Sequence, residues 1–325
     1  ELYGNLAYAL NYPNPVDRLR GKTGYGIWLH GRGKELLPRD TQGCIALHTQ
    51  ELRQLEQHLV PGRTPLLIGS NCSALNPGQD LEHAAFELKT RLSSWVQSWE
   101  RRSREFFDHY HPDRFSKSDP KTFTAFRSRK ESLFERYAWI DIYLGQVQII
   151  PGPGYWVTAF GQYFRSPSFV SQGMKRLYWQ HTGQQGWKIV GREWVPLNLE
   201  LEDQYLQEAR SRIRSWLGEW ASSWASADLQ AYAGHYHPKA SQDGRAGRKA
   251  ITAHKEVVWS QEKPLAVDID NIRIDSAAPG FQVTFEQHYQ GRKGYSDTGI
   301  KSLTLQPESG SFCILRESWR PLPAS

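Results

Sequence analysis

The chain has 325 residues, of which 39% are apolar and 13% aromatic, enough for packed cores in two or three domains. It contains no run of about 18 apolar residues, so the sequence predicts no membrane span, and Glu1 opens no signal-peptide pattern. The net charge of +6 favours acidic partners, but the basic residues are dispersed, and without a Lys/Arg run we expect no nucleic-acid partner.

The first region, residues 1–74, is rich in Gly and Pro. Three short pieces have strand character: "LAYAL", "GIWLH" and "PLLIG". Between the last two lies a predicted helix, "TQELRQLEQHLV", with Thr49 as its expected N-cap. The following "SALNPGQD" is typical of a linker.

Within this region a histidine and a cysteine each stand beside a glycine. A strand ending at His30, a loop and a tight turn at Gly43 would bring Cys44 next to the imidazole. The carbonyl of Gly31 could accept the ring N–H and set the tautomer of His30. The N–H groups of Gly43 and Cys44 could then face a developing oxyanion. These residue types in this order predict a cysteine nucleophile with its base.

The cysteines at 44, 72 and 313 form neither a disulfide framework nor a zinc motif. Cys72 and Cys313 are interpreted as structural, and Cys313 belongs to an apolar strand face. A disulfide between Cys44 and Cys72 is the alternative, and it would remove the reactive thiol. The sequence predicts no metal and no cofactor.

The rest of the chain consists of two similar segments, residues 80–198 and 204–322. Each begins with a Trp-rich amphipathic helix that leads into the phrase His-Tyr-His-Pro, at His109 and at His235. Each continues with paired strand-like phrases, such as "YWVTAFGQYF" and "FQVTFEQHYQ", and ends in "GWKIVGREW" or "SFCILRESW". This period is that of a domain rather than of a solenoid repeat.

Helices followed by alternating strands predict an α+β domain, with helices on one face of a curved antiparallel sheet. The histidines of the repeated phrase are interpreted as helix C-caps in their charged form, with a metal site as the alternative. The phrases resemble the nuclear-transport-factor-2-like (SnoaL-like) superfamily, which implies cone-shaped domains that bind ligands at the mouth. Further candidates for the two mouths, without a catalytic role, are Asp141, Lys175, Glu193 and Glu317.

The first region in turn resembles the L,D-transpeptidase (YkuD-type) catalytic domain. The resemblance is carried by "HG…TQGCIAL" and by the upstream "NYPNPVDRLRGKTGYGIWLHG". It implies a mainly-β domain of which this chain holds the C-terminal part, in the branch of cell-shape L,D-carboxypeptidases. It further implies that Cys44 is the nucleophile, His30 the general base and Gly31 the orienting carbonyl. Thr41, Gln42 and Gly43 line the turn.

Two positions depart from that family. Gln42 stands where many members have His, and Ala46 stands where many have Arg. The charge that would bind the substrate carboxylate is therefore assigned to another arginine. The candidates are Arg18, Arg20, Arg32 and Arg39, of which Arg32 and Arg39 are the preferred pair.

The resemblance implies a periplasmic or cell-envelope enzyme of a Gram-negative bacterium that acts on peptidoglycan stem peptides. The thiolate would release D-Ala from a tetrapeptide stem and leave a thioester on Cys44. An amine acceptor makes the enzyme an L,D-transpeptidase, and water makes it an L,D-carboxypeptidase. The cone domains would bind the wall or a protein partner. The alternative from another class is a non-catalytic wall- or ligand-binding protein built on the two cones.

Overall fold

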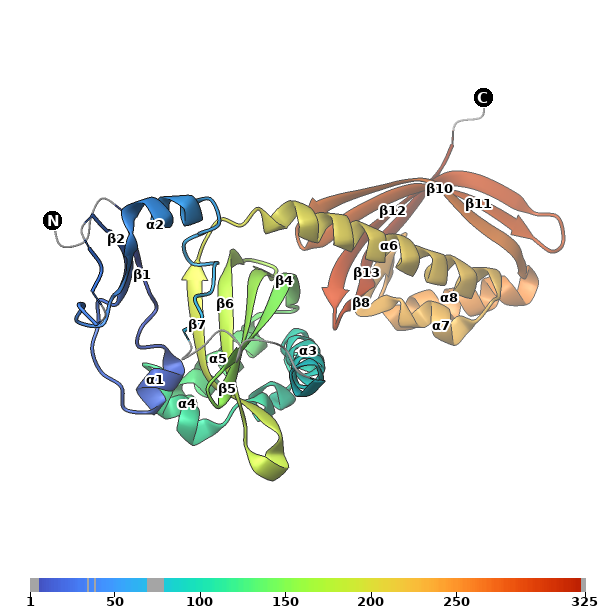
Figure 1. Ribbon diagram of the computed structural model, residues 1–325. Coiled ribbons are helices and arrows are strands. Elements are labelled where there is room, and N and C mark those ends of the chain that lie inside the picture. The colour runs from blue at the N-terminus through green and yellow to red at the C-terminus, as the bar shows by residue number, and fades with distance from the viewer. Residues whose placement is uncertain (1–5, 34, 38, 69–78, 323–325) are drawn as a thin grey trace.

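The structure is a computed structural model that describes residues 6–33, 35–37, 39–68 and 79–322. Figure 1 shows the N-terminal region, in blue, beside a green helix–sheet unit, and a second helix–sheet unit, yellow to red, at the far end. We call these units the first cone and the second cone. Among the described residues, no helix combines the length and the apolarity that crossing a membrane requires.

The N-terminal region is a small sheet with two helices. Its strands follow the order β1-β2-β3, with β1 antiparallel and β3 parallel to β2. Helix α1 begins at a capping box, because the side chain of Asn14 accepts hydrogen bonds from the amides of Val16 and Asp17. The elements are β1 (Ala7–Ala9), α1 (Pro15–Leu19), β2 (Trp28–Arg32), β3 (Ile45–His48) and α2 (Thr49–Glu56).

Two details predicted for this region are wrong. Thr49 is the first residue of α2, and His48 is the N-cap, because β3 runs directly into the helix and the His48 amide donates to the Glu51 carboxylate at 3.2 Å. The predicted strand "PLLIG" is absent from residues 65–68, and Gly69 lies outside the described residues.

The first cone packs its helices on one face of the four-stranded antiparallel sheet β4-β5-β6-β7. Its core consists largely of aromatic rings, including Trp95, Trp99, Phe106 and Phe160. The indole of Trp95 donates to the Tyr110 hydroxyl at 3.0 Å. The elements are α3 (Gln79–Glu100), η2 (Arg104–His109), α4 (Pro112–Ser118), α5 (Phe123–Arg136), β4 (Asp141–Gly152), β5 (Tyr155–Arg165), β6 (Val170–His181), η3 (Gly183–Gln185) and β7 (Trp187–Pro196).

The second cone repeats this arrangement with a longer sheet, in the order β10-β11-β12-β13-β8-β9. Strand β8 joins β13 in parallel, so the sheet is not purely antiparallel. The elements are α6 (Leu201–Ala225), α7 (Leu229–Gly234), β8 (Tyr236–Gln242), β9 (Arg245–Ala246), α8 (Arg248–Gln261), β10 (Pro264–Ala277), β11 (Gly280–Gly291), β12 (Ser296–Glu308) and β13 (Ser311–Pro321). Two α+β cones beside a sheet-rich N-terminal region confirm the predicted fold class.

Strand β5 is buried on both faces from Val157 to Arg165, although its alternation resembles that of a half-exposed strand. One face carries Phe160 and packs against the helices of the first cone. On the other face, Val157 packs in a cluster with Val16 of α1. Further along the strand, Tyr163 stacks on Tyr205 of α6, with ring centroids 4.9 Å apart. The N-terminal region and the second cone therefore both pack on the outer face of this sheet.

The interpretation of the repeated histidines as charged helix C-caps is confirmed only for the position of His235, which is the C-cap of α7, and it is wrong for the charge and for the other positions. His109 ends η2 in a buried position, where burial first and then the charges of Arg91 and Lys188 lower its pKa to about 4. Burial also lowers the pKa of His235, which follows α7. His111 instead begins α4, because its Nδ1 accepts from the backbone of the first turn. Within the described residues, no three His, Cys, Asp or Glu side chains gather as a metal site would require.

Candidate active site

His30 lies on β2, and Cys44 lies directly before β3, the parallel neighbour of β2. In the ladder between β2 and β3, Leu29 pairs with Ile45 and His30 pairs with Ala46. Cys44 immediately precedes β3, two residues before the partner of His30. Because side chains alternate along an extended chain, Cys44 and His30 belong to the same face. A two-residue offset on neighbouring strands separates their Cα atoms by roughly 8 Å, within the combined reach of an imidazole and a thiol.

The imidazole is buried, whereas the thiol is partly exposed. His30 is 3% exposed, and its Nδ1 lies 3.3 Å from the carbonyl oxygen of Gly31, the contact predicted for the orienting group. Gly31 itself has no room for a side chain, because an added Cβ would lie 2.9 Å from Oγ1 of Thr49 at the start of α2. Strand β2 and helix α2 thus hold the backbone that orients the ring. In the predicted role of His30 as general base, Nε2 would be the nitrogen that transfers the proton, because Nδ1 faces the backbone.

The turn before Cys44 has the geometry that its sequence predicts. Gly43 has a φ of +112°, in the region that favours glycine, and an added Cβ would lie 2.8 Å from Cδ1 of Ile27. Thr41 donates from Oγ1 to the carbonyl of Cys44 at 2.7 Å, which closes the turn. The Sγ atom of Cys44 lies 3.6 Å from the carbonyl oxygen of Gly26. Gln42 is exposed at the tip. The oxyanion role of the Gly43 and Cys44 amides stays a prediction.

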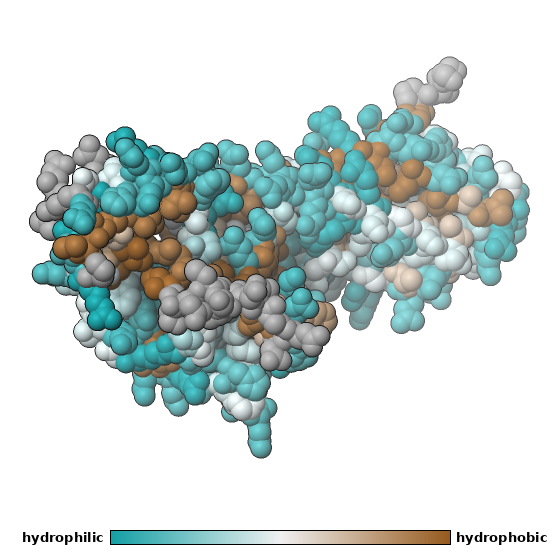
Figure 2. Space-filling model, viewed as in Figure 1, coloured by the Kyte–Doolittle hydropathy of each residue, from teal (hydrophilic) through white to brown (hydrophobic). Residues whose placement is uncertain are grey.

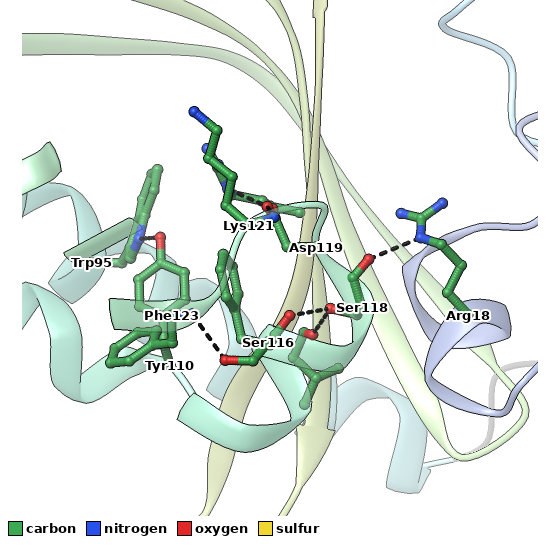
Figure 3. Close-up of polar contacts among 11 residues, drawn as sticks. Arg18, Trp95, Tyr110, Ser116, Ser118, Asp119, Lys121 and Phe123 are labelled. Carbon is green, nitrogen blue, oxygen red and sulfur yellow. Dashed lines mark hydrogen bonds and ion pairs between the residues drawn. The ribbon is translucent and has the colours of Figure 1, made fainter. Parts of the chain in front are cut away.

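Two of the four candidate arginines hold the N-terminal region on the first cone. Arg18 donates from Nε to the carbonyl of Ser118, the last residue of α4, at 2.8 Å, as Figure 3 shows. Arg20 donates to the carbonyl of Pro153, and its guanidinium lies over the ring of Tyr155. Both guanidinium groups are therefore committed to the contact between α1 and the first cone.

The two preferred arginines, Arg32 and Arg39, have different surroundings. Arg32 forms an ion pair with Asp40 at 2.6 Å, which closes the loop between β2 and the Cys44 turn. Arg39 is exposed in the same loop with a φ of +63°, and no described residue forms an ion pair with it. Of the four arginines, Arg39 is the one whose guanidinium has no ion pair or hydrogen bond to a described residue.

The other thiols differ from Cys44. Cys313 is 2% exposed on β13, and burial raises its pKa above the usual range, so it stays a neutral thiol. Cys44 is a free thiol, so the alternative disulfide between Cys44 and Cys72 is wrong; Cys72 itself lies outside the described residues.

The four charged residues predicted for the cone mouths lie in different places in the structure. Lys175 and Glu317 are buried in the first and second cone respectively. Asp141 lies at the junction of the cones, where it accepts from the Tyr205 hydroxyl at 2.7 Å. Glu193 lies on the outer face of the first sheet, where it accepts from Tyr178 at 2.8 Å and from Asn11 of the N-terminal region at 3.0 Å.

Strand periodicity could have separated two of these residues, because Glu193 and Lys175 occupy opposite faces of the first sheet. The identity of the layer that covers each face could not be read from that periodicity.

Comparison with known families agrees with this organisation. The family described as Cds6 C-terminal NTF2-like domain matches residues 87–193 and again 212–318, together more than half of the chain. The L,D-transpeptidase catalytic domain, YkuD, matches residues 2–68. No protein of curated function matches the chain.

Several solved structures are similar to parts of this chain. Bd1075 of Bdellovibrio bacteriovorus is 28% identical over 61% of this chain and 71% of that one, with a TM-score of 0.49. The helical cell shape determining protein Pgp2 of Campylobacter jejuni is 26% identical over 59% and 68%, with a TM-score of 0.43. An NTF2-like protein of unknown function from Pseudomonas putida is 15% identical over 35% and 86%, with a TM-score of 0.31.

Proposed function

Because the chain belongs to the family of the Cds6 C-terminal NTF2-like domain, and because residues 2–68 match an L,D-transpeptidase catalytic domain, we propose that it is a peptidoglycan-modifying cysteine L,D-transpeptidase. The proposed domains are residues 1–74, 80–198 and 204–322. The proposed location is the periplasm, where the stem peptides of the wall are accessible. The observation that carries the proposal is the strand register that puts Cys44 and His30 on one face of adjacent strands.

In the proposed reaction, His30 accepts the proton of Cys44, and the thiolate attacks the carbonyl that links the third, L-configured centre of a tetrapeptide stem to D-Ala. The C–N bond breaks, the D-Ala nitrogen takes the proton from His30, and a thioester remains on Cys44. The amides of Gly43 and Cys44 donate to the oxyanion of the tetrahedral intermediate. Arg39 binds the substrate carboxylate, in the role that Ala46 cannot fill.

The acceptor of the acyl group decides between two products. An amine from a second stem gives a 3–3 cross-link. The alternative acceptor, water, gives a tripeptide and makes the protein an L,D-carboxypeptidase. The partial exposure of Cys44 supports access for either nucleophile to the thioester.

The test is mass spectrometry of purified muropeptides after incubation with the wild type, with Cys44→Ala and with Cys313→Ala as the matched thiol control. We expect products from the wild type and from Cys313→Ala, and none from Cys44→Ala. Cross-linked dimers identify the transpeptidase and tripeptides the carboxypeptidase. If wild type and Cys44→Ala give identical muropeptide profiles, the catalytic proposal is wrong and the binding protein remains.

A further inference from the structure

A cavity of about 200 Å³ lies where the two cones meet. The first cone contributes the residue Trp139 before β4, Arg165 at the end of β5, and the turn from β5 into β6. The second cone contributes the turn between β10 and β11, with Pro279. Residues of both cones therefore form its walls, and no residue of the Cys44 turn is among them.

The walls belong to a packed contact between the cones. Tyr163 of the first cone is part of the hydrophobic core of the second. Arg165 of the first cone donates from Nη2 to the carbonyl of Gly280 in the second at 2.8 Å. The amide and the hydroxyl of Ser166 donate to the carbonyl of Phe169 at 2.9 and 3.1 Å and hold the turn that forms the rim. The cavity is therefore formed in advance, as small-molecule sites commonly are.

One wall of the cavity carries a buried cation. Arg165 is 8% exposed. Its guanidinium carbon lies 4.8 Å from the ring centroid of Phe281 and 5.7 Å from that of Trp139. Nη1 donates to the Tyr205 hydroxyl at 3.3 Å. Aromatic faces and neutral oxygens thus surround a full positive charge.

The acid beside this arginine pairs with a different one. Asp141 accepts from the Tyr205 hydroxyl at 2.7 Å, and its other carboxylate oxygen lies 3.7 Å from Nη1 of Arg212. The Tyr205 hydroxyl therefore stands between Arg165 and Asp141. Among the described residues, no carboxylate lies within ion-pair distance of Arg165. A buried cation without a counterion costs free energy, which cation–π contacts offset only in part.

The rim of the cavity is apolar. Phe169 and Val170 are 50% and 51% exposed, and Pro279 faces the same cavity from the second cone. Figure 2 shows an extensive apolar surface over the N-terminal region as well, but the buried cation in the wall distinguishes the cavity between the cones. One cation matches one negative charge, and a dianion would carry a second charge into apolar surroundings at a cost.

We propose that this cavity binds a small apolar monocarboxylate, with its carboxylate on Arg165 and its hydrocarbon part against Phe169, Val170 and Pro279. Two N–H groups of the guanidinium are bonded, to Tyr205 and to Gly280, and the others remain for the two oxygens of a carboxylate. The bound ligand contacts both cones. This site does not depend on the reaction proposed for Cys44.

The test is isothermal titration of the full chain with three small probes at pH 7. N-acetyl-L-phenylalanine presents the carboxylate of a peptide end, and 3-phenylpropionate presents that of a free acid. N-acetyl-L-phenylalaninamide is the uncharged match of the first probe. We expect at least one acid to bind about ten-fold or more tightly than the amide, and the better acid identifies the source of the carboxylate. Binding of neither acid, or equal binding of all three probes, would overturn the proposal.

Three variants locate the binding. Arg165→Gln removes the charge and should weaken the better acid about ten-fold or more. Phe169→Glu places a negative charge on the half-exposed rim and should have the same effect, so it replaces Arg165→Gln if that variant does not fold. The matched control is Phe86→Glu, the same substitution at a 70% exposed position of α3. Unchanged affinity in Phe169→Glu, or an equal loss in Phe86→Glu, would refute the site.

Hydrogen exchange gives a second readout of the location. Saturation with the better acid should slow amide exchange in both turns of the cavity, residues 166–170 of the first cone and residues 278–280 of the second. Exchange in residues 41–44 should stay unchanged, because the Cys44 turn does not line the cavity. Binding that protects neither cavity turn would contradict the assignment to this place.

Discussion

Gly191 on β7 lies close to α1 of the N-terminal region. A Cβ added there would lie 2.3 Å from Cβ of Pro15 and 3.1 Å from Oγ of Ser118. Optimal carbon–carbon contacts lie near 3.5–4.0 Å, so α1 would have to move by roughly 1 Å or more. The ring of Pro15 cannot rotate away, because it is part of the backbone. We therefore expect Gly191→Ala to push α1 off the sheet.

The expected cost follows from what this contact buries. Overpacking by one methyl group costs about 1–3 kcal/mol. Losing the burial of Val16, which is fully buried between α1 and the sheet, costs about 1.5–3 kcal/mol. Both estimates are about 2 kcal/mol. For a unit of about 60–100 residues, the size of the N-terminal region, this corresponds to a decrease of roughly 8–16 °C in the melting temperature.

The assay combines thermal unfolding with amide hydrogen exchange. Gly191→Ala should lower the melting temperature and increase exchange in α1, whose amides lie in the displaced segment. The control is Gly218→Ala, since an added Cβ within α6 meets no atom within 4 Å and alanine favours helix. If Gly191→Ala melts within about 1 °C of the wild type and α1 exchanges normally, the close approach does not hold the N-terminal region in place.

Three further outcomes follow from burial and charge. A thiol reagent at pH 7.5 should modify Cys44 at least ten-fold faster than Cys313, because burial raises the pKa of Cys313. Peptide mapping would measure both rates, and equal rates would contradict this expectation. Glu317→Gln should destabilise the second cone by about 3–5 kcal/mol, since Lys301 keeps its charge without a partner, and urea unfolding would detect it. The pKa of His109 is lowered in the fold, so its contribution to the free energy of unfolding is complete above pH 6.5 and falls by about 3 kcal/mol as the pH drops toward 4. His109→Asn should flatten that stretch of a stability–pH curve, and an unchanged slope would contradict the reasoning.

Local patterns in the sequence were sufficient for much of this architecture. The repeated tryptophan helices and paired strand phrases predict two cones, because amphipathic period and strand alternation are encoded residue by residue. The glycine before Cys44 predicts a tight turn, and Gly43 has the positive φ that the turn needs. His30 beside Gly31 likewise predicts the imidazole–carbonyl contact.

The tertiary structure decided which faces meet. Alternation along β5 gives no sign that α1 and α6 cover its outer face, and the arginines of the first region look alike until Arg18 and Arg20 are seen to contact the first cone. Periodicity reports whether a side chain is buried, whereas its partner depends on contacts between segments far apart in the chain, and that partner determines the pKa and the charge balance of the buried group.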